Sequence, residues 1–472
     1  MMINNNKKKI IKWIIVISVL AIVSVLLILA LSSAQIFEST VIRSETTSVI
    51  VVFAILLLIL LLLLLTVYIV DRKKESDCEV FVENSVSVSS AKSAAVEVSN
   101  SPEAEDKEVI GGEISRFCML SRIDENKDEY RIKSFDENVS LKKFCEDFRN
   151  YAASELRLYY DIKDIRRFIA GLLVSPIVIL QGMSGTGKTS LAHAMGRFVV
   201  NTSTVIPVQP MWKERTDLLG YYNEFTRRFN ETKLLEKMYE ANYSEEIYIT
   251  VMDEMNIARV EYYFAEFLSL LELPNPEERY IDVVSDVWDN DPKLLKDGRI
   301  KLPINMWFIG TANNDDSTFA ISDKVYDRAM ILNLDSKCDR FIAPKTKPTK
   351  LSAKKFRELG REALDEYALT KRNLKRLEEL DKYLIENFHI TFGNRIMKQI
   401  REYVPIYMSC GGEELEALDD ILAKKIIRKL ETQNPIYLRR AAEGLCTYME
   451  ELFGVDRMPL CIDAIHRLQR NA

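Results

Sequence analysis

The sequence predicts an α/β fold that is followed by a helical C-terminal region and preceded by two transmembrane helices. Three observations lead to this prediction. A glycine-rich loop joins a hydrophobic run to a helical run, two later hydrophobic runs end in polar residues, and two long uncharged segments lie near the N-terminus. With 472 residues the chain is long enough for two or three domains. Its formal net charge of -6 gives no sign of a general nucleic-acid binder.

Two N-terminal segments are predicted to span a membrane. Residues 13–31 and 49–70 are almost wholly apolar, and each is close to the ~20 residues that a helix needs to cross a bilayer. Lysines precede the first segment and basic residues follow the second, with only Arg43 between them, so both termini are expected in the cytoplasm of a multi-pass membrane protein. The alternative is a cleaved signal peptide, because Ser32-Ser33-Ala34 resembles a cleavage site.

A low-complexity segment follows the predicted spans. Residues 75–112 are rich in Ser, Glu, Val and Ala and contain one aromatic residue, Phe81. This composition buries little apolar surface and predicts a flexible tether. Residues 113–138 are densely charged, and a short helix or small subdomain is an alternative there. We therefore expect a transmembrane hairpin over residues 1–74 and a linker or unassigned subdomain over 75–138.

The glycine-rich loop fits the phosphate-binding pattern G-x-x-x-x-G-K-S/T at every fixed position. It lies between the apolar run 177–180 and the helical run 190–195, and Ser175-Pro176 ends a stretch of helical periodicity over 141–173. The glycines let backbone N–H groups curl around a polyphosphate, and the helix N-terminus adds its positive end. Lys188 is expected to reach the outer phosphates, and Thr189 to hold Mg²⁺. The expected nucleotide-binding residues of this loop are Gly182, Ser184, Gly185, Thr186, Gly187, Lys188, Thr189 and Ser190.

A second hydrophobic run carries a pair of carboxylates at its end. Residues 247–252 have a buried-strand pattern that ends in Asp253 and Glu254. Asp253 is expected to position Mg²⁺ through its water shell, and Glu254 to activate the attacking water. An apolar run that ends in Asp-Glu is a weak signal alone. Here it predicts a catalytic role because it follows the phosphate-binding loop.

A third hydrophobic run, residues 306–312, ends in Asn313. Its amide is expected to hold the attacking water or to sense the γ-phosphate; the alternative is an asparagine-rich turn without ligand contact. Farther along the chain, Arg328 can project from one subunit toward the phosphates of its neighbour. Without the other motifs it would be an exposed arginine.

Taken in order, these stretches resemble the AAA+ superfamily, and within it the McrB-type branch that is grouped with dynein-related ATPase domains. The resemblance runs from about Tyr151 to the C-terminus. It rests on the sequences LQGMSGTGKT (180–189), WKERTDLLGY (212–221), MDEMNIAR (252–259), IGTAN (309–313) and FGNR (392–395).

The resemblance implies a P-loop AAA+ core with a parallel sheet flanked by helices over residues 139–345, and a C-terminal α-helical lid over 346–472. It implies hydrolysis of ATP with Mg²⁺ and assembly into a homo-oligomeric ring, usually a hexamer, in which Arg328 acts in trans. Arg395 falls where such proteins can carry a second sensor arginine that contacts the nucleotide. Capping a helix or binding a local carboxylate is the alternative for Arg395.

Two departures from McrB itself bear on substrate and partner. McrB hydrolyses GTP and has a Met-Asn-Thr-Ala-Asp signature, where this chain has Ala312-Asn313-Asn314-Asp315-Asp316. ATP is therefore expected, with GTP as the alternative. McrB also has a DNA-reading domain before its motor, where this chain has the predicted hairpin, so direct nucleic-acid binding stays open. By analogy, a separate effector or nuclease subunit is the expected partner.

The leading hypothesis is a membrane-anchored nucleoside triphosphatase that couples hydrolysis to the remodelling or activation of a partner, in the manner of an McrB-like restriction or defence motor. A nucleotide-gated membrane scaffold, in which hydrolysis only resets the state, is one alternative. A MoxR-like chaperone of a membrane complex is another. The chain has no Ser/His/Asp set and no zinc-ligand spacing to suggest other chemistry.

Overall fold

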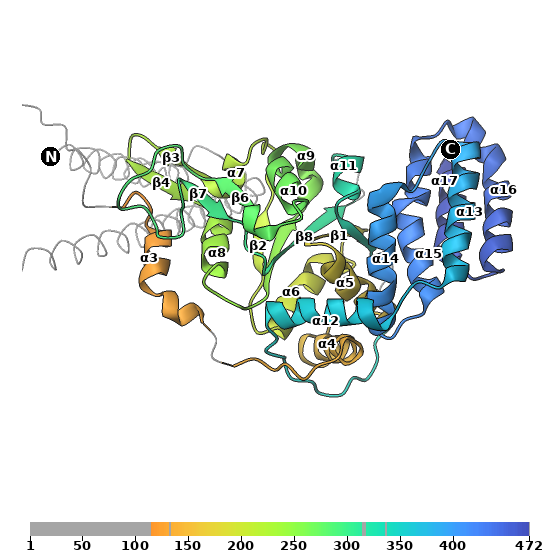
Figure 1. The fold of residues 1–472 in the computed structure, drawn as a ribbon, viewed down its shortest axis with the longest axis horizontal. Helices are drawn as coiled ribbons and strands as arrows, with labels where there is room; N and C mark the ends of the chain where they lie inside the picture. Colours follow the sequence, from red (N-terminus) through yellow and green to blue (C-terminus); the bar gives the residue numbers. More distant parts are fainter. Residues whose placement is uncertain (1–114, 132–133, 314–317, 336–337, 472) are drawn as a thin grey trace, which may run out of the picture. The chain divides into compact units, whose positions relative to one another are not determined.

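The computed structural model describes residues 115–131, 134–313, 318–335 and 338–471. The chain divides into two compact units, residues 1–109 and 110–472, and every described residue lies in the second. The centre of this unit is a five-stranded parallel sheet with the strand order β2-β5-β8-β1-β9 (Figure 1). Its strands are β1 (Ile177–Gly182), β2 (Thr204–Pro207), β5 (Tyr248–Asp253), β8 (Met306–Asn313) and β9 (Met330–Asn333). The predicted parallel α/β core is confirmed.

The strands alternate their side chains between two hydrophobic cores, one on each face of the sheet. In β1, Val178 and Leu180 belong to one core, whereas Ile177 and Ile179 belong to the other. The first face is covered by α4 (Leu141–Leu156), α5 (Ile162–Val174), α6 (Lys188–Phe198) and α12 (Ala353–Glu366). The second is covered by α7 (Thr216–Leu219), α8 (Lys233–Ala241), α9 (Val260–Tyr263), α10 (Ala265–Leu271) and α11 (Asp323–Tyr326). Helices on both faces explain why the strands read as continuous apolar runs.

Local sequence signals set the bounds of the helices around β1. The Asp161 carboxylate accepts a hydrogen bond from the Lys163 N–H (2.7 Å) and caps the start of α5, as a short polar side chain does at a helix N-terminus. The helix ends at Val174, because Pro176 restricts the residue before it to extended conformations. Because α5 is joined to β1 by two residues and packs on the sheet, it runs antiparallel to that strand.

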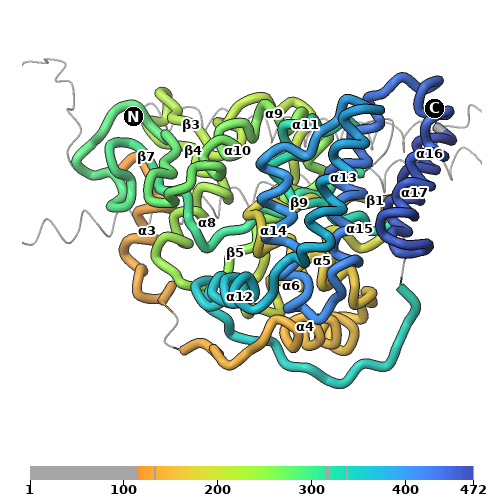
Figure 2. Tube along the Cα trace, turned by 45° about the vertical axis from the view of Figure 1, so that its right-hand side comes forward, coloured from red at the N-terminus to blue at the C-terminus, as the bar shows by residue number. Residues whose placement is uncertain are grey.

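Two antiparallel hairpins and several short helical turns extend from the core. The hairpins are β3 (Gly220–Asn223) with β4 (Arg228–Glu231), and β6 (Tyr280–Asp282) with β7 (Arg299–Lys301). The 3₁₀ turns of the core are η3 (Met255–Ile257) and η4 (Pro276–Glu278). The connection from β9 to α12 runs along the outside of α4 (Figure 2), where the Arg149 guanidinium lies 3.8 Å from the centroid of the Phe341 ring.

Residues that the sequence left unassigned pack against the second face. They form α3 (Met119–Glu125) and the 3₁₀ turn η2 (Lys127–Tyr130). Phe117, Leu120 and Ile123 are buried in the core of that face. The Glu231 carboxylate accepts hydrogen bonds from the backbone N–H groups of residues 118–120 at 2.8–2.9 Å, so it satisfies donors at the start of α3 that have no partner within the helix.

The C-terminal part is helical throughout its described length. It consists of α13 (Lys371–Phe388), α14 (Gly393–Ser409), α15 (Glu414–Lys425), the 3₁₀ turn η5 (Ile427–Thr432), α16 (Pro435–Phe453) and α17 (Pro459–Asn471). Apolar residues recur at helical spacing along these helices, as Leu377, Leu380 and Leu384 do on the buried side of α13. Figure 1 shows them gathered on the side of the sheet where β1 lies, and β9 is the outermost strand on that side.

The predicted fold class was wrong in its two transmembrane helices, and the membrane location that follows from them is corrected with it. No helix within the described ranges is long and apolar enough to cross a bilayer. The described helices are amphipathic instead: α16, for example, exposes Arg439, Arg440 and Glu443 on one side while it buries the other. The two segments in question, 13–31 and 49–70, lie outside the described residues.

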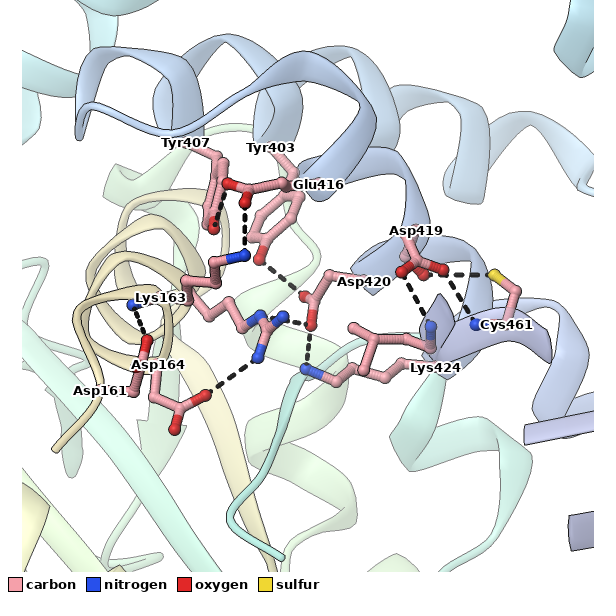
Figure 3. Close-up of polar contacts among 12 residues, drawn as sticks. Asp161, Lys163, Asp164, Tyr403, Tyr407, Glu416, Asp419, Asp420, Lys424 and Cys461 are labelled. Carbon is pink, nitrogen blue, oxygen red and sulfur yellow. Dashed lines mark hydrogen bonds and ion pairs between the residues drawn. The ribbon is translucent and has the colours of Figure 1, made fainter. Parts of the chain in front are cut away.

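A buried ionic cluster joins the lid to helix α5 of the core (Figure 3). The Asp420 carboxylate of α15, which is 1% exposed, accepts a hydrogen bond from Tyr403 Oη (2.7 Å). It also pairs with Lys424 Nζ (2.5 Å) and with Arg167 Nε of α5 (3.0 Å). Arg167 makes a second ion pair, with Asp164 (2.9 Å). Burial lowers the pKa of the Lys424 ammonium, and Asp420 opposes that shift.

We expect Asp420→Ala to lower the free energy of unfolding by about 3–5 kcal/mol, because it leaves two buried cations without their shared carboxylate. Urea unfolding of the full chain, followed by circular dichroism, measures the change. Glu379→Ala removes the surface pair with Lys375 (3.7 Å) on α13 and should change the free energy by no more than about 0.5 kcal/mol. Equal effects of the two variants would show that the cluster does not stabilise the packing of lid on core.

Candidate functional site

The phosphate-binding loop has the backbone that its glycines predict. β1 ends at Gly182 and α6 begins at Lys188, which confirms the expected order of strand, loop and helix. Gly185 and Gly187 have φ values of 78° and 94°, in the left-handed region that favours glycine. A Cβ atom on Gly182 would lie 2.3 Å from the Leu334 carbonyl oxygen, so no larger residue fits there without displacement. Ser184 and Gly185 are exposed at the N-terminus of α6, where backbone N–H groups attract anions.

Two side chains brace this loop from within. The Lys188 ammonium, on a residue that is 7% exposed, donates to the carbonyl oxygens of Gly182 (2.9 Å) and Met183 (2.8 Å). The Tyr160 hydroxyl donates to the Gly187 carbonyl (3.0 Å), and burial raises the pKa of Tyr160, which keeps this donor protonated. Tyr160 was not identified from sequence, because a tyrosine before a helix has no pattern that separates it from a core residue.

The predicted magnesium residues lie in direct contact. Thr189 Oγ1 donates to Asp253 Oδ1 (2.8 Å), although one residue follows β1 and the other ends β5. Thr311 Oγ1, from β8 between them, donates to the same oxygen (2.8 Å). Hard cations such as Mg²⁺ prefer oxygen ligands, and here a hydroxyl and an anionic carboxylate are already adjacent. The donor set therefore fits Mg²⁺, with Thr189 and Asp253 as the residues that would hold it.

The predicted base stands next to this contact. Glu254 is exposed and has φ of 53°, a left-handed conformation that is uncommon for a residue other than glycine. Its backbone N–H donates to Thr311 Oγ1 (2.8 Å), which fixes the peptide in this turn. Strained backbone of this kind is often found at functional sites. Thr311 thus orients both carboxylate residues, and sequence reasoning gave it no role.

Asn313 lies beside the start of the phosphate-binding loop. In the parallel pairing of β1 with β8 it is the direct partner of Gly182. Its carbonyl oxygen accepts hydrogen bonds from Asn256 Nδ2 (2.9 Å) and Thr318 Oγ1 (3.1 Å). The sequence-predicted residues of three strands are therefore brought together at the carboxyl edge of the sheet, where open α/β folds bind their ligands.

Arg328 lies at the opposite edge of the sheet from the phosphate-binding loop. Its carbonyl oxygen accepts a hydrogen bond from Ser175 Oγ (3.0 Å), and Ser175 precedes β1. The six residues of β1 span about 20 Å, which is longer than an arginine side chain. Lys425 Nζ of the lid binds the carbonyl oxygens of Tyr326 (2.6 Å) and Ala329, on either side of Arg328. Burial lowers the pKa of Lys425 to about 7, against the effect of Asp327.

Arg395 lies with Arg328 and not with the phosphate-binding loop of its own chain. Arg328 Nη2 and Arg395 Nη2 pair with the two oxygens of one carboxylate, Glu272, at 2.7 and 2.6 Å. The local carboxylate that sequence reasoning left open for Arg395 is therefore present. Glu272 itself was missed, since it follows α10 and belongs to none of the recognised stretches.

A cavity of about 760 Å³ lies beside the site, between the carboxyl edge of the sheet and the lid. Gln181, Asn313 and Asn333 contribute the ends of three strands to it, and Lys424 and Arg428 contribute lid side chains. The loop residues 183–189 do not line it. Its volume is that of a ligand pocket, but the charges of its walls already pair with one another, as in the cluster around Asp420.

Comparison with known families assigns two parts of the chain. Residues 177–329 match the family described as an AAA domain of the dynein-related subfamily, and residues 345–472 match a domain of unknown function (DUF8727). Neither match covers half of the chain. No curated protein matches the sequence. The α/β part is therefore an AAA-type ATPase domain, and its family match spans the loop, both carboxylates, Asn313 and Arg328.

Two solved structures are similar at low identity. A candidate ATPase from Cytophaga hutchinsonii is 14% identical with a TM-score of 0.43; the match covers 70% of this chain and 97% of that one. A full-length MCM homolog from Methanopyrus kandleri is 12% identical with a TM-score of 0.33; that match covers 68% of this chain and 61% of the other. Both likenesses are too distant to carry a conclusion about function.

We expect Thr311→Val to weaken Mg²⁺-dependent binding of a fluorescent ATP analogue by about tenfold, equal to ~1.4 kcal/mol. Valine has nearly the same shape but cannot donate to Asp253 or accept from the Glu254 N–H. Titration of the purified protein with and without Mg²⁺ measures the effect. Thr311→Ser keeps the hydroxyl and should bind as the wild type does. Wild-type affinity in the valine variant would contradict the orienting role of Thr311.

Proposed function

We propose that the chain is a nucleoside triphosphatase that hydrolyses ATP at the carboxyl edge of its sheet. The observation that supports this most directly is the hydrogen bond between Thr189 and Asp253 (2.8 Å), because it joins the phosphate-binding loop to the carboxylate strand. A binding site for phosphate alone would not need a carboxylate at this point. Glu254 and Asn313 then stand within the same edge, next to the two joined residues.

In this proposal each residue has a separate task. Lys188 and the N–H groups at the start of α6 bind the outer phosphates and neutralise their charge. Thr189 and Asp253 would hold Mg²⁺, which when bound would supply charge stabilisation to the transferred phosphoryl group. Glu254 accepts the proton of the attacking water, and Asn313 orients that water toward the γ-phosphate. The left-handed turn at Glu254 directs its carboxylate outward, where a water can reach it.

We also propose that the site is completed by a second copy of the chain, in a ring that is usually a hexamer in similar ATPases. Transferred phosphoryl groups are stabilised by arginine, and Arg328 cannot reach the phosphate-binding loop of its own chain. In a ring, the edge that carries Arg328 would face the loop of the neighbouring subunit. Residues 139–345 would then form the motor core and residues 346–472 the lid.

The McrB-type resemblance supports a finer proposal for the output of hydrolysis. In it, nucleotide turnover remodels or activates a separate effector, for which a nuclease subunit is the expected class. ATP is the proposed substrate and GTP the alternative, since only Asn313 and the last aspartate of the McrB signature are present; that aspartate, residue 316, lies outside the described residues. Turnover measured with each nucleotide in the presence of the other decides between them.

Two substitutions test the hydrolytic mechanism. Lys188→Ala should abolish both nucleotide binding and phosphate release. Glu254→Gln should retain binding but lower turnover by about 100-fold or more, because an amide cannot accept the proton of the attacking water. Phosphate release and binding of a fluorescent nucleotide by the full chain measure the two steps. Lys382→Ala, which removes an exposed ion pair of α13 (3.9 Å), is the control and should leave both unchanged. Wild-type turnover in both test variants would refute the proposed function.

A further inference from the structure

One carboxylate joins two arginines that come from different parts of the chain. Glu272 directly follows α10 of the core, Arg328 precedes β9, and Arg395 lies in the first turn of the lid helix α14. Glu272 Oε2 pairs with Arg328 Nη2 at 2.7 Å, and Glu272 Oε1 with Arg395 Nη2 at 2.6 Å. Because each arginine uses a different oxygen, both ion pairs exist at once.

The geometry of this triad points to a positioning role for Glu272. Two guanidinium groups repel each other unless an anion lies between them, and long side chains lose conformational entropy when they are ordered. A carboxylate that binds both offsets the repulsion and restricts both side chains. Arg328 is fixed further by Nη1, which donates to the Lys324 carbonyl oxygen (2.8 Å). Preorganised arginines contribute more to phosphoryl transfer than mobile ones do.

The exposure of the triad shows that it is available to a partner. The side chains of Arg328, Glu272 and Arg395 are 22%, 31% and 48% exposed. The three charges sum to +1, which leaves an attraction for an anion after the internal pairs are made. Neither arginine lies at the phosphate-binding loop of its own chain, since both are at the amino-terminal edge of the sheet with Glu272.

We propose that Glu272 is a positioning residue that aligns Arg328 and Arg395 as a pair for the triphosphate held by a neighbouring copy of the chain. This inference rests on the proposed hydrolysis between subunits. It adds that Arg395 serves the neighbour's site together with Arg328, and that a carboxylate outside the recognised motifs sets the geometry of both.

A mixed-subunit experiment tests the role of Glu272 without changing the subunit that binds the nucleotide. Full-length Lys188→Ala supplies intact arginines but has a disabled phosphate-binding loop, whereas Arg328→Ala supplies an intact loop. Each alone should be inactive, and mixing them should restore turnover at the interfaces between the two. Adding Glu272→Ala to the Lys188→Ala donor should then lower the restored turnover by about tenfold or more. The KM for ATP should stay the same, because the loop that binds ATP belongs to the other subunit.

A control variant on α10, the helix that Glu272 directly follows, separates positioning from a general loss of structure. Glu266 of α10 pairs with Arg215 at 2.9 Å and is 32% exposed, which matches Glu272 closely. Glu266→Ala in the donor should leave the restored turnover unchanged. Glu272→Gln in the donor should fall between wild type and alanine, since an amide oxygen binds a guanidinium only weakly. Arg395→Ala in the donor should reduce turnover as Glu272→Ala does. Light scattering and thermal melting of each mixture report assembly and folding.

The outcomes distinguish the inference from the function on which it rests. If wild-type turnover does not depend on Lys188, the proposed hydrolysis fails. If wild-type turnover depends on Lys188 but mixing the two single variants does not restore turnover, the proposal of a site between subunits is refuted. The proposed role of Glu272 is then refuted as well. If mixing restores turnover and Glu272→Ala in assembled donors leaves it unchanged or raises it, Glu272 does not align the arginines. If Arg395→Ala lowers turnover only when it is placed in the loop-supplying subunit, Arg395 does not act together with Arg328 on the neighbour's nucleotide.

Discussion

Two hydrogen bonds to one oxygen hold the candidate site together. Thr189 follows β1, Thr311 lies on β8 and Asp253 ends β5, and both hydroxyls donate to Asp253 Oδ1 at 2.8 Å. The contacts are possible only because β8 lies between β1 and β5 in a parallel sheet, so that the three strands end at the same edge. The strand order thus determines which residues can share the chemistry, and the two hydrophobic cores that cover the sheet maintain that order.

Sequence patterns predicted the parts of this arrangement that are local. The loop from Gly182 to Thr189, the strand that ends in Asp253 and the strand that ends in Asn313 each combine a strong apolar run with polar residues at its end. Sequence patterns gave no role to Thr311, although it lies inside the run 306–312, or to Glu272, which lies in no such run. Their partners are distant in sequence and meet only through the strand order and the packing of α10. The membrane spans were predicted from hydropathy alone, which reports the composition of a segment and nothing of its packing; the described helices contain no counterpart to them.

Arg328 lies at the opposite end of the strands from the residues that are predicted to bind phosphate in the same chain. The groups predicted to bind phosphate lie at the carboxyl edge of the sheet. The Arg328 backbone is held at the amino-terminal edge, by Ser175 directly and by Lys425 of the lid through the residues on either side. A fold of this kind cannot bring the two sets of groups together by a side-chain rearrangement, because the length of β1 separates them. In the proposed assembly the edge of another copy would supply this arginine, so that turnover would depend on assembly.

The lid contacts both the amino-terminal and the carboxyl edge of the sheet. It is therefore connected to the triad of Arg328, Glu272 and Arg395 and to the region of the phosphate-binding loop. Helix α14 begins with Arg395 at the triad and continues to Tyr407, whose hydroxyl donates to Glu416 (3.4 Å). Glu416 pairs with Lys163 (2.6 Å) in the first turn of α5, close to Tyr160 and the phosphate-binding loop. Helix α14 has 17 residues and is about 25 Å long, so it connects the two contacts across the core. In the proposed assembly, a nucleotide-dependent movement near the loop would reach Arg395 through α5, α15 and α14, and so would act on the arginine that the same subunit offers to its neighbour.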